Sequence, residues 1–180
     1  MLTLGCGGGS KDPLSCAGYP ASETSPYIFP FASGKRVTVS QGNCSSESHY
    51  GKSRYAYDFS VPLGTEIIAS RAGEVITVVE HHPDNDSSTE GNSIEIRHVD
   101  GSIAIYQHLK QNSAEVEEGD LVKQGDLIAK SGNSGNSTGP HLHFAVYSDA
   151  DSDQSIPISF NNLKNNSESV LREKSKYRAQ

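Results

Sequence analysis

The amino-acid sequence predicts a mainly β fold: an antiparallel β-sheet domain with few or no helices. The 180 residues include 17 glycines, no tryptophan and one methionine, a composition typical of a turn-rich protein rather than a helical bundle. Short β-rich runs alternate with Gly, Asn and Asp turns along most of the chain. The length fits one domain with a sizeable core, so we expect one functional site.

The composition divides the chain into three regions. Residues 1–25 are rich in Gly, Ser and Pro and lack apolar periodicity, which predicts a flexible N-terminal tether. Residues 26–160 contain the β-rich runs and form the predicted domain. Residues 161–180 are polar, with weak helical character from Ser167 onward and no convincing apolar face, so we expect a frayed C-terminal tail.

The expected strands combine apolar alternation, or a short apolar run, with flanking turn residues. They cover residues 36–40, 55–61, 67–69, 73–80, 92–99, 103–109, 126–130 and 141–147. The dipeptide Asp100-Gly101 predicts a hairpin with a two-residue primed turn between two of these strands. The longer loop 81–92, HHPDNDSSTEGN, is expected to line a groove.

Charge and hydropathy exclude several classes of partner. The formal net charge is -7 and no Lys/Arg cluster stands out along the sequence. The sequence therefore lacks the electrostatic signature of binding to nucleic acid or to an anionic membrane, and we exclude nucleic acid as a partner. No stretch approaches the roughly 18 consecutive apolar residues that span a bilayer.

The three cysteines suggest an exported protein. In MLTLGCGGGS, Leu-Gly-Cys before a Gly/Ser tether resembles the lipobox of a bacterial lipoprotein cut before Cys6, a candidate lipid anchor. The preceding residues are too few for a signal peptide, so a truncated gene start or an expression remnant is the alternative. With Cys6 acylated, Cys16 and Cys44 form an even pair for a disulfide in an oxidising compartment; two reduced thiols are the alternative.

Residues 131–146, SGNSGNSTGPHLHFAV, place two histidines at the start of the last expected strand. Because side chains at i and i+2 of a strand point to the same face, His141 and His143 share one face. The residues expected on the opposite, core-facing side are Leu142, Phe144 and Val146. The strand is therefore a rigid mount for two imidazoles, and the preceding Gly/Ser run is expected to be flexible.

Two further strands each offer one polar group. In YAYDFSV, Asp58 lies opposite the aromatic face of its strand. In IAIYQHL, His108 is expected on the face of Ala104 and Tyr106, opposite the isoleucines and Leu109.

The other histidines are expected to serve structure or to face solvent. His98 shares a strand face with Ile94 and Ile96, so we expect a hydrogen-bonded core histidine. His81 and His82 precede a proline in a loop and are expected to be exposed.

Three stretches, taken together and in order, point to a known family. They are SHYGKSRYAYDFSVPLGTEIIASRAGEV, IYQHL and VEEGDLVKQGDLIAKSGNSGNSTGPHLHF. An upstream His and Asp, a Tyr-x-His-Leu segment and Gly-Pro-His-Leu-His together resemble the lysostaphin/LytM-like zinc metallopeptidases, which cleave bacterial cell-wall peptides. The resemblance covers about residues 27–147 and implies the family's antiparallel β fold with a substrate groove.

The resemblance also implies a role for each site residue. By position, zinc is held by His49, Asp58 and His143, while His108 and His141 are unliganded catalytic histidines. The family commonly separates its first His and Asp by three residues, whereas eight lie between His49 and Asp58 here. Because Asp58 is followed by FSVPLGT, as the metal aspartate is in the family, we place the extra residues in loop 50–57.

This ligand set suits catalysis. Two imidazoles and one carboxylate are typical of Zn²⁺, and three protein ligands leave the fourth position to a water whose pKa falls toward about 7. We expect the zinc-bound water to attack a peptide carbonyl, with His141 taking its proton. His108 is expected to stabilise the oxyanion or to share the acid–base work.

The resulting prediction is a zinc endopeptidase acting on peptidoglycan stem-peptide cross-links. The expected bond joins D-Ala to a diamino acid, with an oligoglycine bridge as the less favoured target. We expect a monomer exported to the periplasm or cell envelope.

The main alternative is a catalytically inactive family member that regulates another hydrolase or binds the wall. A biotinyl or lipoyl carrier would need a Met-Lys pair, and a non-haem iron oxygenase would not need the two extra histidines.

Overall fold

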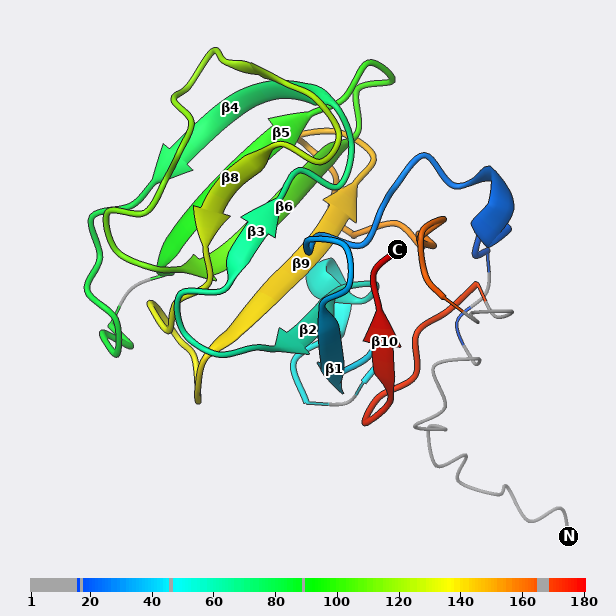
Figure 1. Cartoon of the computed structure of the whole chain (residues 1–180), viewed down its shortest axis with the longest axis horizontal. Coiled ribbons are helices and arrows are strands. Elements are labelled where there is room, and N and C mark those ends of the chain that lie inside the picture. The colour runs from blue at the N-terminus through cyan, green and yellow to red at the C-terminus, as the bar shows by residue number, and fades with distance from the viewer. Residues whose placement is uncertain (1–15, 17, 46, 89, 165–168) are drawn as a thin grey trace, which may run out of the picture.

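The computed structural model describes residues 16, 18–45, 47–88, 90–164 and 169–180. Its main feature is an eight-stranded antiparallel sheet in the order β10-β1-β2-β9-β6-β5-β4-β7, accompanied by a two-stranded sheet of β3 and β8 (Figure 1). The strands are β1 (Arg36–Gln41), β2 (Tyr57–Ser60), β3 (Glu66–Ile68), β4 (Gly73–Val79), β5 (Asn92–Arg97), β6 (Ile103–Leu109), β7 (Leu121–Val122), β8 (Leu127–Lys130), β9 (His141–Tyr147) and β10 (Lys176–Arg178).

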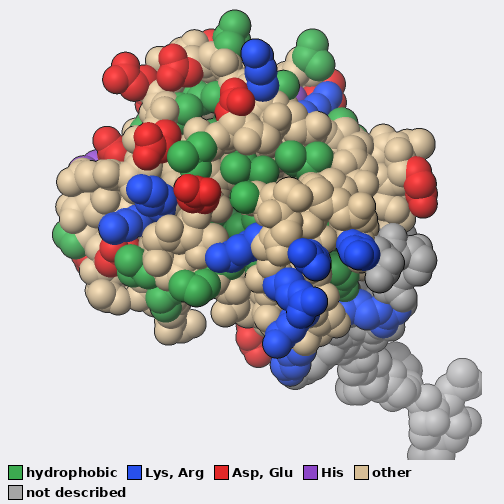
Figure 2. All heavy atoms as spheres, in the orientation of Figure 1, with side chains coloured by type: hydrophobic (Ala, Val, Ile, Leu, Met, Phe, Trp, Pro, Cys, Tyr) green, Lys and Arg blue, Asp and Glu red, His purple; other side chains and the backbone are tan. Residues whose placement is uncertain are grey.

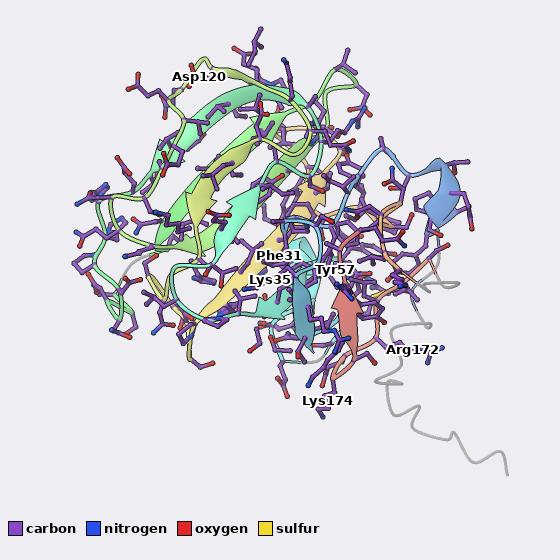
Figure 3. All side chains as sticks on the ribbon, viewed as in Figure 1. Phe31, Lys35, Tyr57, Asp120, Arg172 and Lys174 are labelled. Atoms are coloured by element: carbon purple, nitrogen blue, oxygen red, sulfur yellow. A yellow bond between two sulfur atoms is a disulfide. The ribbon has the colours of Figure 1, made fainter. Side chains whose placement is uncertain are left out.

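The hydrophobic core lies between the large sheet and the small one, and the small sheet lies in front of the large sheet in Figure 1. Alternation puts Leu142, Phe144 and Val146 of β9 into this core, all with no exposed surface. Phe31 and Tyr57 also lie in the interior, beside β1 and β10 (Figure 3). The opposite face of β2 and β9 carries Asp58, His141 and His143.

The predicted fold class is confirmed, and all eight expected strands are present. Sequence analysis missed β7, which pairs with β4, and β10, which pairs with β1. Among the described residues, helical structure is limited to two short 3-10 turns, η2 (Ser22–Thr24) and η3 (Gly51–Ser53).

The prediction of a frayed, weakly helical tail after residue 160 is wrong. Lys176–Arg178 forms the edge strand β10, and Val170, Leu171 and Ala179 are buried. The backbone N–H of Leu171 donates to the hydroxyl of Tyr57, 3.2 Å away. The apolar residues of this segment are too widely spaced for a helical face, but they pack against a sheet formed by distant residues.

The N-terminal region is attached to the domain before residue 25. Cys16 and Cys44 form a disulfide, as the cysteine count predicted. Ser22 and Ser25 are buried, so the tether predicted for residues 1–25 ends earlier than expected. Cys6, the candidate lipid anchor, lies outside the described residues. In the described segments, no helix has the length and apolar character needed to cross a membrane.

The β5–β6 hairpin forms as predicted, but its turn is of another type. His98 and Ser102 pair through their backbones, and only Gly101 of the intervening residues has positive φ, at 86°. Asp100 does not adopt the positive φ that a primed two-residue turn requires. A three-residue loop with glycine in the left-handed region therefore closes the hairpin.

No Lys/Arg cluster stands out along the sequence, but the fold brings basic side chains together. Lysine and arginine side chains gather over the β1–β10 end of the molecule (Figure 2), although they come from two separate parts of the sequence. Figure 3 shows Lys35 and Lys174 at this end, with Asp120 at the opposite end. Antiparallel pairing of β1 with β10 brings these cations together, which a search for consecutive basic residues does not detect.

Candidate functional site

Asp58 and His143 face each other across neighbouring strands. β2 pairs with β9 so that Asp58 lies directly opposite His143, and side chains in such a pair point to the same face. The Asp58 Oδ1 and His143 Nδ1 atoms are 2.8 Å apart. The regular register of two central strands thus fixes the first two members of the predicted metal site.

His49 reaches the same carboxylate from the loop after β1. Its Nε2 lies 3.2 Å from Asp58 Oδ1, and its side chain is fully buried. Between the two residues, the chain forms the 3-10 turn η3 (Gly51–Ser53) before it enters β2. The extra residues of loop 50–57 are therefore accommodated as a compact turn, which brings His49 back to Asp58.

His49 is held in one tautomer. Its Nδ1 hydrogen-bonds the backbone oxygen of Gly42 at 2.8 Å, and because a carbonyl oxygen only accepts, Nδ1 carries the proton. The buried Nε2 then presents a lone pair to a carboxylate oxygen and has no hydrogen-bond partner among the described residues. Two electron-rich atoms at this distance require a cation or an added proton beside them.

The residues present fit a zinc ion. The donor atoms of His49, Asp58 and His143 all lie within 4.8 Å of one another. Two imidazoles and a carboxylate are a ligand set typical of catalytic zinc, and the Gly42 carbonyl orients one imidazole as such sites commonly require. Burial acts to raise the pKa of Asp58, but the neighbouring His143 and His49 hold it well below its usual range, so the carboxylate stays ionised.

His141 lies beside the three candidate ligands but is oriented differently. Its Nδ1 hydrogen-bonds the Gly139 carbonyl oxygen at 2.8 Å and lies 3.1 Å from the Ser137 hydroxyl. The Nε2 atom points toward the site, 3.8 Å from Asp58 Oδ1. The loop that precedes β9 thus fixes this ring with one nitrogen free to exchange a proton.

His108 reaches the site through a β-bulge. β5 pairs Ser93 with Gln107 and Asn92 with Leu109, so His108 is an extra residue on β6. Its φ is 61°, in the left-handed region that non-glycine residues rarely adopt. Strict alternation would send His108 into the core, and the bulge turns it toward the site instead.

The prediction of which face of β6 points into the core is therefore wrong, although His108 does reach the groove. Ala104 and Tyr106 belong to the main core. Ile105 lies on the other face, where it packs against a small cluster next to the site. His108 shares a face with Gln107, which is paired with His143 of β9.

The bulged histidine is held by the loop before β9. His108 Nδ1 hydrogen-bonds the Ser134 carbonyl oxygen at 2.8 Å, and its ring lies 4.6 Å from that of His141, centroid to centroid. Burial, followed by the neighbouring His141, lowers the pKa of His108 to about 4. His108 is therefore neutral near pH 7.

The Gly/Ser run before β9 is not the flexible loop that the sequence predicted. Residues 131–135 are buried, and Ser134 Oγ donates to the Leu109 carbonyl and accepts from the Asn92 N–H. Small side chains are needed because backbones meet here: a Cβ on Gly135 would lie 2.5 Å from the Glu90 oxygen. Only the tip, including Asn136 and Thr138, is exposed.

The site opens into a polar groove. A cavity of about 480 Å³ exposes His108, His141 and His143, and a second of about 370 Å³ continues past Asp58 along β1 and β2. The loop expected to line a groove contributes Glu90, and loop residue Glu47 lies on the rim of both cavities. Sequence analysis missed these two acidic residues and the supporting Ser134, because no local pattern marks them.

The remaining histidines lie away from this groove. His98 is buried and hydrogen-bonds the Ala72 carbonyl, as predicted for a core histidine. His81 is exposed as predicted, and His82 is half-buried with its ring 4.0 Å from that of His81.

Comparison with known proteins identifies the class of protein. The model of peptidase family M23 matches residues 52–155, more than half of the chain. The chain belongs to peptidase family M23, whose members are zinc-dependent metallopeptidases. The match begins after His49, so the assignment of His49 to the site depends on the geometry described above.

Individual relatives agree with this family. The peptidoglycan DD-endopeptidase ShyB of Vibrio cholerae is 39% identical over 89 residues, which are 49% of this chain and 19% of ShyB. The curated relatives are much longer proteins, and the matched region is about a fifth of their length.

Solved structures show the same architecture. The catalytic domain of the prophage-encoded M23 protein EnpA from Enterococcus faecalis has a TM-score of 0.57 at 26% identity, covering 72% of this chain and 94% of that one. Lysostaphin from Staphylococcus simulans has a TM-score of 0.53 at 28% identity, covering 74% and 51%. The resemblance to lysostaphin-like peptidases is confirmed.

Proposed function

We propose that this chain is a zinc-dependent endopeptidase that hydrolyses peptide cross-links of peptidoglycan. One observation carries the proposal: three candidate ligands lie together at the base of an open groove that two unliganded histidines also line. His49, Asp58 and His143 would hold the metal, which when bound acidifies a water and polarises the peptide carbonyl. A structural metal site would not need two further imidazoles beside it.

The hydrogen bonds of the two unliganded histidines favour acid–base roles. In His141 and His108 alike, Nδ1 donates to a backbone carbonyl, so the neutral ring presents the lone pair of Nε2 to the groove. His141 would accept a proton from the attacking water at Nε2 and pass it to the leaving amine. For His108 to donate to an oxyanion, its ring would need a second proton, so sharing the proton transfer is the better-supported role.

The substrate class follows from family membership and from the named relatives. The 39% identity to a DD-endopeptidase supports a bond between D-Ala and a diamino acid over an oligoglycine bridge. The Cys16–Cys44 disulfide supports action in an oxidising compartment outside the cytoplasm, where peptidoglycan lies.

The test is digestion of purified peptidoglycan by the zinc-loaded protein, with released muropeptides identified by mass spectrometry. We expect cross-linked dimers to become monomers, and the mass of the products to identify the cleaved bond. A chelated sample and the His141→Ala variant should be inactive, while His81→Ala, which alters an exposed histidine, should be unaffected. Intact dimers in the presence of stoichiometric zinc would favour the regulator or wall-binding alternative.

A further inference from the structure

Four cations surround a cavity at the β1–β10 edge of the large sheet. Arg36, Lys164, Lys176 and Arg178, here called the basic edge, line a cavity of about 400 Å³ together with Tyr177. All four are exposed, and none forms an ion pair with an acidic side chain in the described part of the chain. This concentration of unpaired positive charge contrasts with the net charge of -7.

The pairing of the two strands places like charges directly against each other. Arg36 of β1 lies opposite Arg178 of β10, and Lys176 lies two residues away on the same face of β10. Like charges in directly opposed positions destabilise a sheet. The arrangement therefore does not serve stability, and an anion bound in the cavity would neutralise it.

The basic edge and the candidate active site share one face of the sheet. Strand register forms a continuous row across four strands: His141 is opposite Ser60, Ser60 opposite Thr38, and Thr38 opposite Lys176. Three strand spacings separate the ends of this row, about 14 Å. The groove already covers the first part of this path, since Ser60 lines it together with His141.

We propose that the basic edge binds carboxylates of the peptidoglycan strand that occupies the groove. This inference rests on the proposed function, because it identifies the ligand as part of the same substrate. Stem peptides carry free carboxylates, and arginine side chains bind carboxylates through paired hydrogen bonds. An extended anionic chain can contact the basic edge while one of its peptide bonds lies beside His141.

The surroundings of the basic edge favour a carboxylated polymer over a lipid surface. Binding to a membrane surface usually combines cations with apolar side chains that enter the acyl region. The exposed large apolar residues in the described part of the chain are Tyr50, Leu63, Val99, Leu121 and Leu127, and none lies on β1 or β10. The basic edge therefore presents charged side chains around a cavity, without exposed large apolar side chains on β1 or β10.

The test measures binding without catalysis. The chelated full chain is co-sedimented with purified peptidoglycan sacculi, and wild type is compared with the triple variant Arg36→Gln, Lys176→Gln, Arg178→Gln. We expect affinity to fall about tenfold, with a weaker salt dependence. The matched control neutralises Arg97, Lys110 and Lys123 and should bind like wild type. Unchanged affinity of the edge variant, or an equal loss in the control, would overturn the proposal.

Three further comparisons identify the ligand. On sacculi whose carboxyl groups have been amidated, wild type should bind no better than the edge variant; a persisting difference would show that carboxylates are not the ligand. Tighter binding of wild type to phosphatidylglycerol vesicles than to sacculi, lost in the edge variant, would assign the edge to lipid instead. Exchanging Arg36 and Arg178 for Lys keeps the charge but loses the paired hydrogen bonds, so it should cost less affinity than exchanging the same two residues for Gln; an equal loss would contradict a contribution from charge.

The melting temperature reports on folding, and the release of muropeptides reports on cleavage. The edge variant should melt at or slightly above the wild-type temperature, because it relieves opposed like charges; a lower melting temperature would contradict the strained pairing. If wild type binds sacculi through the basic edge but releases no muropeptides, the proposed endopeptidase activity fails while the binding site stands.

Discussion

Strands β9 and β6 both deliver histidines to the groove, but in different ways. On β9, His141 and His143 follow the plain two-residue alternation, with Leu142 and Phe144 buried behind them. On β6, His108 reaches the same groove only because a bulge and a positive φ reverse its direction. Sheet register gives His141 and His143 their shared face, whereas the direction of His108 depends on the bulge.

Two of the candidate ligands and the bulged histidine are supported differently. The candidate ligands Asp58 and His143 sit opposite each other in the regular part of the sheet, where strand pairing alone fixes their separation. His108 is bound by the Ser134 carbonyl, and Ser134 in turn is fixed by Leu109 and Asn92. A metal site tolerates little displacement, while a proton-transfer group can be tuned by the loop that holds it.

The largest effect should come from the regular strand. His143→Ala removes a candidate ligand, so bound zinc should be lost and cleavage of cross-linked muropeptides should fall about 10³-fold or more, since a catalytic metal supplies several kcal/mol of stabilisation. Zinc content by mass spectrometry and rates on purified dimers measure the two effects. His82→Ala, in a loop outside the groove, is the control. Full zinc occupancy in His143→Ala would exclude this residue as a ligand.

Substitution of the two unliganded histidines should separate chemistry from metal binding. His141→Ala and His108→Ala should each lower kcat about 10²- to 10⁴-fold while one equivalent of zinc is retained. If both rings serve the same proton transfer, the double variant should be little worse than either single one. Loss of zinc in His108→Ala would show that the bulge presents a ligand, and the contrast between β6 and β9 would then disappear.

The contact between Ser134 and the bulged His108 can be weakened without substituting His108 or His141. Ser134→Ala removes two buried hydrogen bonds, to the Leu109 carbonyl and from the Asn92 N–H, at a cost of about 1–3 kcal/mol in the free energy of unfolding. We expect kcat to fall about tenfold with unchanged zinc affinity, because the Ser134 carbonyl shifts away from His108.

Ser131→Ala provides the matched control for this experiment. Its hydroxyl also makes two hydrogen bonds in the same run, to the Pro62 carbonyl and from the Thr65 N–H, but it does not contact His108. It should lose comparable stability and keep its kcat. Equal losses of kcat in both variants would mean that general loosening of the loop, not the position of His108, limits the rate.

The parts of the molecule that the sequence predicted are those governed by local periodicity. The faces of β9 and β2 follow from alternation, so the positions of His141, His143 and Asp58 could be predicted. The direction of His108 could not, because a bulge depends on how β5 pairs with β6. His49 could be named only through the family resemblance, since its position depends on the compact turn η3.

Long-range pairing accounts for the remaining errors. Strand β10 contains one half-buried tyrosine between charged residues. Nothing in that segment alone predicts that Arg178 pairs with Arg36, 142 positions earlier in the sequence. The basic edge exists only once these strands pair. Missing the strand therefore also meant missing the charge cluster, although both of its parts were visible in the sequence.

The smallest effect concerns the β5–β6 turn, where the buried His98 directly follows β5 and has no proposed part in the chemistry. Burial is the main cause that lowers the pKa of His98 below its ordinary value near 6.5, against the hydrogen bond to the Ala72 carbonyl, which raises it. The unfolded chain therefore binds more protons than the folded one as pH falls below about 6.5, and His98 makes the folded state less stable there.

His98→Gln removes this titration while keeping a donor for Ala72, so the variant should be about 1 kcal/mol less stable than wild type at pH 7.5, with a smaller gap at pH 5.5. Thermal melts of both proteins at the two pH values measure the gap, and activity at pH 7.5 should be unchanged. A gap that widens on acidification would mean that His98 is stabilised as the imidazolium. A loss of activity would mean that the β5–β6 turn influences the bulge at the far end of β6.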